Sequence, residues 1–142
     1  MTTTLHAHSH GIRRRACVLA ALPLLAARPA WATPLQDAMR RAEALRDDAV
    51  RAGDQAYGAV VLRGDTIVGA APSRVVTAGD PTAHAEMEAI RDAAQRLRTR
   101  DLTGCVLVST SRPCRMCEAA AGWAGIARMV HGESLTDAGV PR

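Results

Sequence analysis

Residues 80–90, DPTAHAEMEAI, place a histidine and a glutamate two positions apart at the start of a predicted helix. Residues 80–82, Asp-Pro-Thr, are of the types that favour the first turn of a helix. Alanines and other apolar residues then recur at helical spacing, so the sequence predicts a helix over residues 83–97. His84 and Glu86 would lie in its first turn and point in different directions.

Other helix and strand patterns lie on both sides of this segment. Thr33 and Pro34 are typical of a helix start, and Gly53 is typical of a residue that ends one. Before the helix over residues 83–97, the sequence predicts a helix over residues 33–53, two strands over residues 57–62 and 66–70 that are joined by a tight turn at residues 63–65, and a loop over residues 71–79. After it, the sequence predicts a strand over residues 105–109, a helix over residues 112–126 and a strand over residues 128–132.

The order of these elements predicts the fold class. The first two strands form a hairpin and are antiparallel, whereas the last two flank a helix, as in a parallel crossover. The sequence therefore predicts an α/β domain in three layers, with helices on both faces of a mixed sheet. Because phenylalanine is absent, the core must consist of small and medium aliphatic side chains.

The basic net charge belongs to the N-terminal segment. The chain has 142 residues, which suits one domain, and its net charge is +4. It has 18 arginines and no lysine, and four arginines lie in residues 1–32. The 14 arginines that remain balance 14 acidic residues. A neutral domain argues against a nucleic-acid partner.

Residues 1–32 have the pattern of an export signal. Arg13, Arg14 and Arg15 precede a short apolar run that ends at Ala30-Trp31-Ala32, a processing pattern. The arginine pair before Ala16 resembles a twin-arginine signal. We therefore expect a periplasmic domain over residues 33–142, with no membrane span after processing. The alternative is a cytoplasmic protein whose leader is an N-terminal helix or a misassigned start.

Residues 112–117, RPCRMC, supply two cysteines at the start of the next predicted helix. With His84, Cys114 and Cys117 can provide three ligands of a tetrahedral zinc site and leave the fourth position to water. Zinc lowers the pKa of such a water towards about 7. Glu86 need not bind the metal, so it can act as the catalytic proton shuttle.

The H-A-E and P-C-x-x-C motifs together resemble the cytidine deaminase-like superfamily, most closely its guanine deaminase and tRNA adenosine deaminase branch. The resemblance covers about residues 35–133 and is strongest in YGAVVL, DPTAHAEMEAIR and PCRMCEAAAGWAGIARMVHG. It implies a Zn²⁺ cofactor held by His84, Cys114 and Cys117, with Glu86 as the proton shuttle. It also implies a cytidine deaminase-like fold, a homodimer, and Pro113 as the residue that starts the cysteine helix.

The chain departs from that family in three places. Ser73 stands where the family has a substrate-binding asparagine, and we predict that Ser73 and Ala85 contact the substrate. Arg112 replaces a glutamate before the Pro-Cys pair. The chain also ends at Arg142, so we expect a C-terminally shortened form of the fold. These departures affect the substrate and leave the zinc chemistry unchanged.

The motifs favour a zinc-dependent hydrolytic deaminase of a free nucleobase or nucleoside, of guanine, cytosine, cytidine or adenosine type, which releases ammonia. A tRNA adenosine deaminase is the close alternative, and a non-catalytic zinc-binding paralogue is another. A thiol oxidoreductase built on C-x-x-C would leave His84 and Glu86 unexplained.

Several remaining residues are interpreted as structural. We expect Cys105 and the methionines Met116 and Met129 in the core, and His131 in the last strand. Trp123 is expected to pack in the core or against another subunit.

Overall fold

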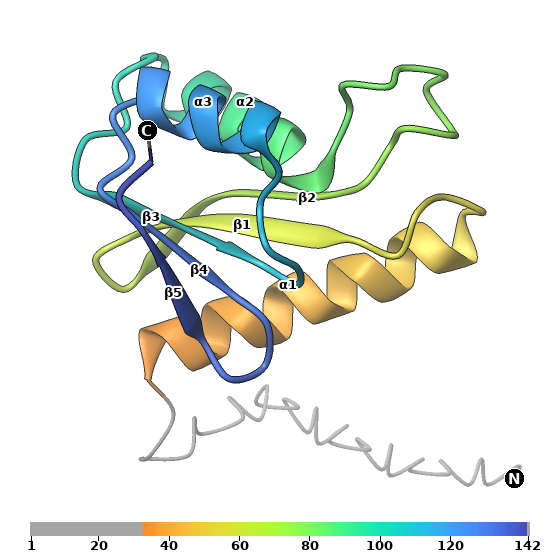
Figure 1. The fold of residues 1–142 in the computed structure, drawn as a ribbon, viewed down its shortest axis with the longest axis horizontal. Coiled ribbons are helices and arrows are strands. Elements are labelled where there is room, and N and C mark those ends of the chain that lie inside the picture. Colours follow the sequence, from red (N-terminus) through yellow and green to blue (C-terminus); the bar gives the residue numbers. More distant parts are fainter. Residues whose placement is uncertain (1–32, 142) are drawn as a thin grey trace, which may run out of the picture.

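The computed structural model describes residues 33–141, so the predicted export signal lies outside the described residues. The elements in chain order are α1 Pro34–Arg51, β1 Gly58–Arg63, β2 Thr66–Pro72, α2 Ala85–Leu97, β3 Cys105–Ser109, α3 Arg115–Trp123, β4 Arg128–His131 and β5 Thr136–Gly139. The strands form one five-stranded sheet in the order β2-β1-β3-β4-β5 (Figure 1). None of the helices in residues 33–141 is long and apolar enough to cross a membrane.

The sheet is mixed, as the sequence predicts. β1 pairs antiparallel with both β2 and β3, and β3 pairs parallel with β4 across the α3 connection. The helices cover both faces, with α1 on one side and α2 and α3 on the other (Figure 1). The three-layer α/β/α prediction is confirmed.

Helix α1 begins and ends with the residues that the sequence predicts. The Thr33 hydroxyl accepts from the Gln36 amide at 3.3 Å, and the Gln36 side chain accepts from the Thr33 amide at 2.8 Å. This reciprocal capping satisfies amides that have no partner within the helix. Gly53 follows the helix with a φ of +77°, the conformation that favours glycine at this place.

The alternation of side chains in β1 divides the core into two layers. Ala59 and Val61 face α2 and α3, together with buried Leu107 of β3. Val60 and Leu62 face α1, whose buried stripe includes Met39. Alanine is common at these contacts, so the helices lie close to the sheet. The predicted aliphatic core is confirmed.

Two glycines permit this close approach. A Cβ atom at Gly58 would lie 2.0 Å from the Ala42 carbonyl oxygen of α1, and one at Gly69 would lie 2.4 Å from the Ala89 carbonyl oxygen of α2. Both distances are far below van der Waals contact. Gly58 and Gly69 therefore set the distance of the two helices from the sheet.

The fifth strand was not predicted from the sequence. Thr136–Gly139 pairs antiparallel with β4, and Arg128 Nε donates to Asp137 Oδ2 at 2.9 Å across the pair. The segment reads TDAG and lacks the β-branched or aromatic run that marks a strand. Its conformation comes from pairing with β4.

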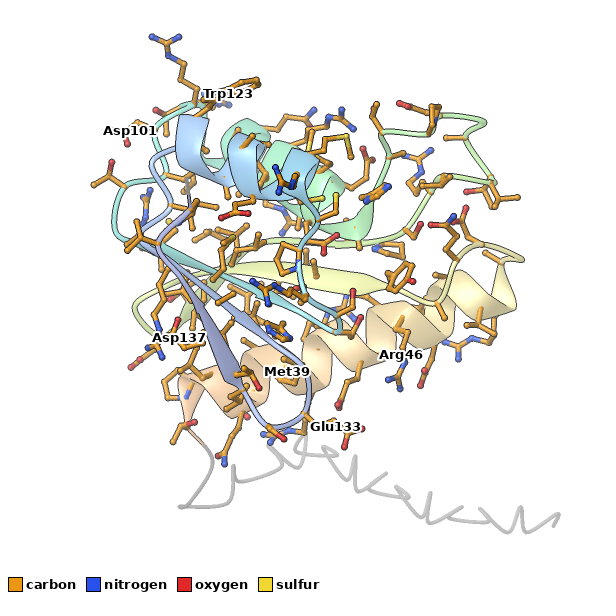
Figure 2. The ribbon with its side chains drawn as sticks, in the orientation of Figure 1. Met39, Arg46, Asp101, Trp123, Glu133 and Asp137 are labelled. Carbon is orange, nitrogen blue, oxygen red and sulfur yellow. The ribbon has the colours of Figure 1, made fainter. Side chains whose placement is uncertain are left out.

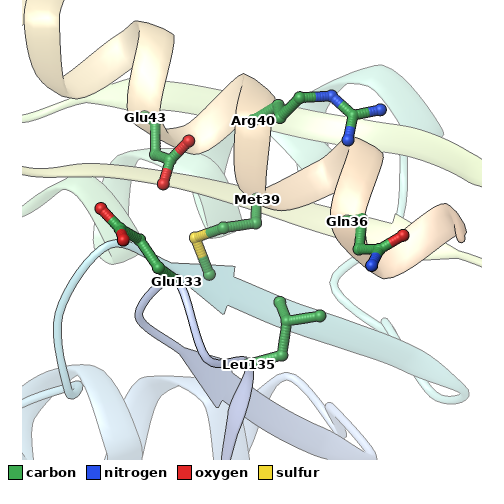
Figure 3. A pocket seen from close by; sticks show the side chains of 6 residues that line it. All are labelled: Gln36, Met39, Arg40, Glu43, Glu133 and Leu135. Carbon is green, nitrogen blue, oxygen red and sulfur yellow. The ribbon is translucent and has the colours of Figure 1, made fainter. Parts of the chain in front are cut away.

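The α1 face carries a cavity of about 180 Å³ between the helix and the segment after β4. Figure 3 shows the side chains of Met39, Glu43 and Glu133 around it. Because α1 and the cysteine helix α3 cover opposite faces of the sheet, this cavity does not belong to the predicted metal site (Figure 1).

The residues interpreted as structural have mixed outcomes. Cys105 and Met129 are buried, as predicted, and the Arg63 side chain donates to the Cys105 sulfur at 3.4 Å. Met116 and His131 are half-buried. The core interpretation of Trp123 is wrong, because the side chain is 87% exposed at the outer end of α3 (Figure 2).

Candidate metal centre and active site

His84 lies at the N-terminus of α2, where the chain changes from extended to helical. It is the N-cap residue, with φ −61° and ψ 151°. The helix thus begins at Ala85 and not at residue 83, which corrects the predicted start. Residues 80–82 form a turn in which the Asp80 carboxylate accepts from the Thr82 amide at 2.7 Å, and the Ala83 carbonyl then accepts from the Arg74 amide of the preceding loop at 3.0 Å.

Cys114 occupies the corresponding position on α3. It is the N-cap residue, and the helix runs from Arg115 to Trp123, so the predicted span of residues 112–126 is too long at both ends. Pro113 lies before the N-cap and disfavours helical geometry at the residue that precedes it. At the other end, Gly125 has a φ of +75° and stops the helix.

The two helix starts bring three ligand atoms together. His84 Nδ1 lies 3.7 Å from Cys114 Sγ and 3.7 Å from Cys117 Sγ. The two sulfur atoms are also 3.7 Å apart, and both thiols are free. The ligand atoms of His84, Cys114 and Cys117 form a triangle that could hold a metal ion, with Cys117 buried and Cys114 exposed.

The size of this triangle fits zinc. Zinc–sulfur bonds of about 2.3 Å and zinc–nitrogen bonds of about 2.0 Å at tetrahedral angles give a sulfur–sulfur edge of about 3.8 Å and a sulfur–nitrogen edge of about 3.5 Å. Burial raises the pKa of the Cys117 thiol far above its ordinary value, and the charge of Glu86 raises it further. A bound dication reverses this effect, because a thiol that coordinates a metal loses its proton. The donor set therefore suits Zn²⁺.

Glu86 lies beside the ligands in the first turn of α2. Its Oε2 atom is 3.7 Å from Cys117 Sγ, and the residue is only 5% exposed. Burial raises the pKa of the Glu86 carboxyl above its ordinary value, against the opposing effects of its own amide and of His84. A carboxyl group with a raised pKa beside a metal site is suited to accept and return a proton.

Ser73 lies in the loop that leads from β2 to α2 and is buried. Its hydroxyl donates to Asp54 Oδ1 at 2.8 Å, and its amide donates to the Tyr57 carbonyl at 3.0 Å. The next amide, that of Arg74, donates to the Ala83 carbonyl at 3.0 Å, immediately before His84. The loop is thus attached to the start of α2, while substrate contact by Ser73 stays a prediction.

Asp54 organises this loop and was missed from the sequence. One carboxylate oxygen accepts from the Ser73 hydroxyl and the Gln55 amide, and the other accepts from the amides of Val76 and Thr77 and from the Thr77 hydroxyl. In the sequence Asp54 follows Gly53 and reads only as a turn residue. No local pattern connects it with residues 73–77.

The other predicted positions are placed as follows. Ala85 is fully buried as the first residue of α2, so its methyl group is part of the core and any substrate contact by it stays a prediction. Pro113 is buried and Arg112 is exposed, both immediately before the cysteine helix.

Comparison with known families agrees with this geometry. The family model for the cytidine and deoxycytidylate deaminase zinc-binding region matches residues 32–133. The chain belongs to this family. The match includes both helix starts and every strand except β5. It confirms the resemblance that the H-A-E and P-C-x-x-C motifs indicated.

Two curated relatives match most of the domain. The guanine deaminase of Bacillus subtilis is 37% identical over 101 residues, which are 70% of this chain and 65% of that protein. The tRNA(Ile)-lysidine synthase of Deinococcus radiodurans is 43% identical over 109 residues, which are 76% of this chain and only 19% of that protein. The chain thus spans less than two thirds of either relative.

Solved structures of the family share the fold. The crystal structure of Bacillus subtilis guanine deaminase has a TM-score of 0.65 at 35% identity, over 68% of this chain and 62% of that one. A structure of a tRNA:A34 deaminase has a TM-score of 0.66 at 32% identity, over 68% and 70%. A chain in complex with 2,6-diaminopurine has a TM-score of 0.65 at 31% identity, over 70% and 56%.

Proposed function

We propose that the protein is a zinc-dependent hydrolytic deaminase of a free nucleobase or nucleoside, of guanine, cytosine, cytidine or adenosine type, which releases ammonia. The observation that carries the proposal is the triangle of His84, Cys114 and Cys117 with Glu86 beside it. A zinc site that serves only to stabilise a fold needs no carboxylate outside its ligands.

His84, Cys114 and Cys117 would hold the zinc ion. When bound, zinc supplies a Lewis acid that activates water for attack at neutral pH. Two thiolates balance the charge of the dication. Because Cys117 is buried and Cys114 is exposed, an ion held by both would lie at the edge of the core.

Glu86 would transfer the protons of the reaction. It accepts a proton from the attacking water and gives it to the ring nitrogen next to the amino-bearing carbon. It then carries the second proton of that water to the departing amine, which leaves as ammonia while the carbon becomes a carbonyl. Burial raises the pKa of the Glu86 carboxyl, which favours its uptake of a proton.

The relatives support a small substrate of the purine class. One is a guanine deaminase, and a solved relative was crystallised with 2,6-diaminopurine. The neutral balance of charge after residue 32 also favours a small molecule over a nucleic acid.

Deamination of adenosine in tRNA is the second candidate. It is favoured by the similarity to the tRNA:A34 deaminase structure. A non-catalytic zinc-binding paralogue is the third, and it would retain zinc without releasing ammonia from any substrate. The assay that follows separates all three.

The test measures ammonia release from guanine, adenine, cytosine and their nucleosides, and from a tRNA anticodon stem-loop, by the zinc-loaded protein. We expect turnover of at least one base or nucleoside. The Glu86→Gln variant should retain zinc and lose about a thousandfold or more of the rate. Turnover of the stem-loop alone would establish the second candidate.

Glu88→Gln provides the matched control. Glu88 lies one half-turn further along α2, where it pairs with Arg91 and Arg74 and contacts no ligand atom. The rate of ammonia release by the Glu88→Gln variant should stay close to that of the unaltered protein. Equal rates for the Glu86→Gln variant and the unaltered protein would refute the proton-transfer role of Glu86.

We also propose export and dimer formation. Export to the periplasm is supported by the leader pattern of residues 1–32, and N-terminal sequencing of protein from the cell envelope should find a start near residue 33. A homodimer is supported by the exposed Trp123 indole, because large aromatic side chains are enriched at interfaces. Sedimentation analysis should give twice the chain mass, and Trp123→Ala should reduce it.

A further inference from the structure

The loop between β2 and α2 depends on hydrogen bonds for its order. Residues 74–82 contribute no side chain to the apolar core of the described chain, and Val76 is 59% exposed. Hydrophobic burial therefore contributes little to the stability of this loop. The carboxylate of Asp54 supplies contacts in its place. It accepts from the Ser73 hydroxyl, from the amides of Val76 and Thr77 and from the Thr77 hydroxyl.

Asp54 is itself fixed to the end of α1. Its amide donates to the Ala49 carbonyl at 2.9 Å, and the Gly53 amide donates to the Val50 carbonyl at 3.0 Å. These two bonds end the helix in the way that a left-handed glycine allows. Helix α1 covers the face of the sheet opposite to α2 and α3, whose starts carry the predicted ligands (Figure 1). The loop is thus anchored to a helix across the sheet from the ligands.

The loop in turn fixes the peptide before His84. The Arg74 amide, next to Ser73, donates to the Ala83 carbonyl at 3.0 Å. Because the peptide group is planar, the direction of this carbonyl sets the position of the His84 amide and Cα. His84 is the N-cap residue of α2, but its side chain makes no capping hydrogen bond. The direction of the imidazole therefore depends on the backbone that carries it.

A second contact between the loop and α2 is weak. Arg74 Nη1 lies 3.7 Å from Glu88 Oε2, and the Arg74 side chain is 58% exposed. An exposed ion pair at this distance contributes little to stability. The hydrogen bonds to Asp54 are stronger, because their acceptor is a charged carboxylate.

We propose that Asp54 is a positioning residue for the metal centre. By holding the loop, it keeps the peptide between Ala83 and His84 in place, and with it the imidazole that faces the two cysteine sulfurs. The proposal rests on the zinc site of the proposed function and adds to it a residue outside the ligand triangle. Coupling between two sites is reciprocal, so bound zinc should also hold the loop closed.

The first test measures zinc affinity. The zinc-free protein is titrated with Zn²⁺ in competition with a chelator of known affinity, at a temperature where circular dichroism shows each variant to be folded. Asp54→Asn should bind zinc about tenfold more weakly than the unaltered protein, a typical effect of removing a group that orients a ligand. A purely structural role would lower the stability of this variant and leave its zinc affinity unchanged, which would overturn the proposal.

Asp137→Asn is the matched control. It makes the same substitution at a carboxylate of β5 that accepts from Arg128 and from the Gly139 amide, away from the loop. Its zinc affinity should stay within about twofold of that of the unaltered protein, because the two sites share no partner. If both variants lose affinity equally, the effect comes from net charge and the proposal is refuted.

The second test needs no substitution at Asp54. Amide exchange at Val76 and Thr77 is followed in the zinc-free and the zinc-loaded unaltered protein. We expect zinc to slow exchange at both amides by about tenfold, the same factor as the change in affinity. In Cys117→Ser, which lacks a ligand, added zinc should leave both rates unchanged. Unchanged rates in the unaltered protein would overturn the proposal even if Asp54→Asn failed to fold.

The Gly139 amide is the internal reference for exchange. It donates to Asp137 Oδ1 at 2.8 Å on the outermost strand of the sheet, so it reports on a carboxylate contact outside the loop. Zinc should leave its exchange rate unchanged. Slowing at Gly139 as large as that at Val76 and Thr77 would mean that zinc stabilises the whole domain, and it would refute the positioning role.

The outcomes separate this proposal from the proposed function. Zinc affinity and loop exchange that are coupled as described, without ammonia release from any substrate, would support the positioning role and refute the deaminase. Ammonia release by a protein whose zinc affinity is insensitive to Asp54→Asn would refute the positioning role alone.

Discussion

The hydroxyl of Ser73 donates to Oδ1 of Asp54 at 2.8 Å and joins the turn after α1 to the loop that leads into α2. Through the bond from the Arg74 amide to the Ala83 carbonyl, this connection reaches the residue before the predicted ligand His84. The helix that carries half of the candidate site is therefore held in part by a carboxylate 30 positions earlier in the chain.

Replacing Asp54 should loosen the loop before α2. The two carboxylate oxygens of Asp54 together accept five hydrogen bonds, and Asp54→Asn keeps one oxygen acceptor but loses the charge and the second oxygen. We expect a lower midpoint of urea unfolding and faster amide exchange at Val76 and Thr77. Asp137→Asn, another carboxylate with local hydrogen bonds, should leave exchange at these two amides unchanged.

The same carboxylate makes stability depend on pH in the acid range. Desolvation raises the pKa of Asp54, but the Thr77 and Gln55 amides and the Ser73 and Thr77 hydroxyls outweigh it and hold the pKa well below its ordinary value of 3.8. Because the pKa of Asp54 is lower in the folded protein than in the unfolded chain, its ionised carboxylate stabilises the fold fully at pH values above 3.8. This contribution is lost as the pH falls below that value.

Thermal unfolding measured from pH 7 down to pH 2 checks the sign. The difference in melting temperature between the unaltered protein and Asp54→Asn should be largest at neutral pH and shrink as the solution becomes more acidic than the ordinary carboxyl pKa. A difference that grows towards low pH would contradict the assignment.

Removing a ligand should remove the metal. We expect about one zinc per chain in the unaltered protein and almost none after His84→Ala or Cys117→Ser, measured by native mass spectrometry. Cys105→Ser is the control, because Cys105 is a buried thiol at the start of β3 outside the ligand triangle. Chelation should lower the melting temperature of the unaltered protein and of this control, since a ligand of the folded state stabilises it.

The close packing of α1 on the sheet should make Gly58 intolerant of alanine. Gly58→Ala would place a methyl carbon 2.0 Å from the Ala42 carbonyl oxygen, so α1 must move. We expect the free energy of unfolding to fall by about 3 kcal/mol or more. Gly122→Ala, at an exposed position in α3, should raise it by up to about 1 kcal/mol through helix propensity.

Local patterns in the sequence were sufficient to predict most elements and to select the candidate ligands. The capping residues of α1, the hairpin of β1 and β2, and the periodicity of α2 are short-range features, and each is present in the structure. Helices α2 and α3 begin two to three residues later than predicted, directly after His84 and Cys114. A turn closed at Asp80 precedes α2 and Pro113 precedes α3; both are local features, but they compete with the local signals for a helix.

By itself, the sequence determined the fold class and singled out His84, Cys114, Cys117 and Glu86 as candidate site residues, because those features depend on residue types at fixed short spacings. Tertiary structure alone decided that β5 is a strand and that Asp54 holds the loop before His84. These are contacts between segments whose separation along the chain carries no periodic pattern, so only the packing of the sheet and its helices brings them together.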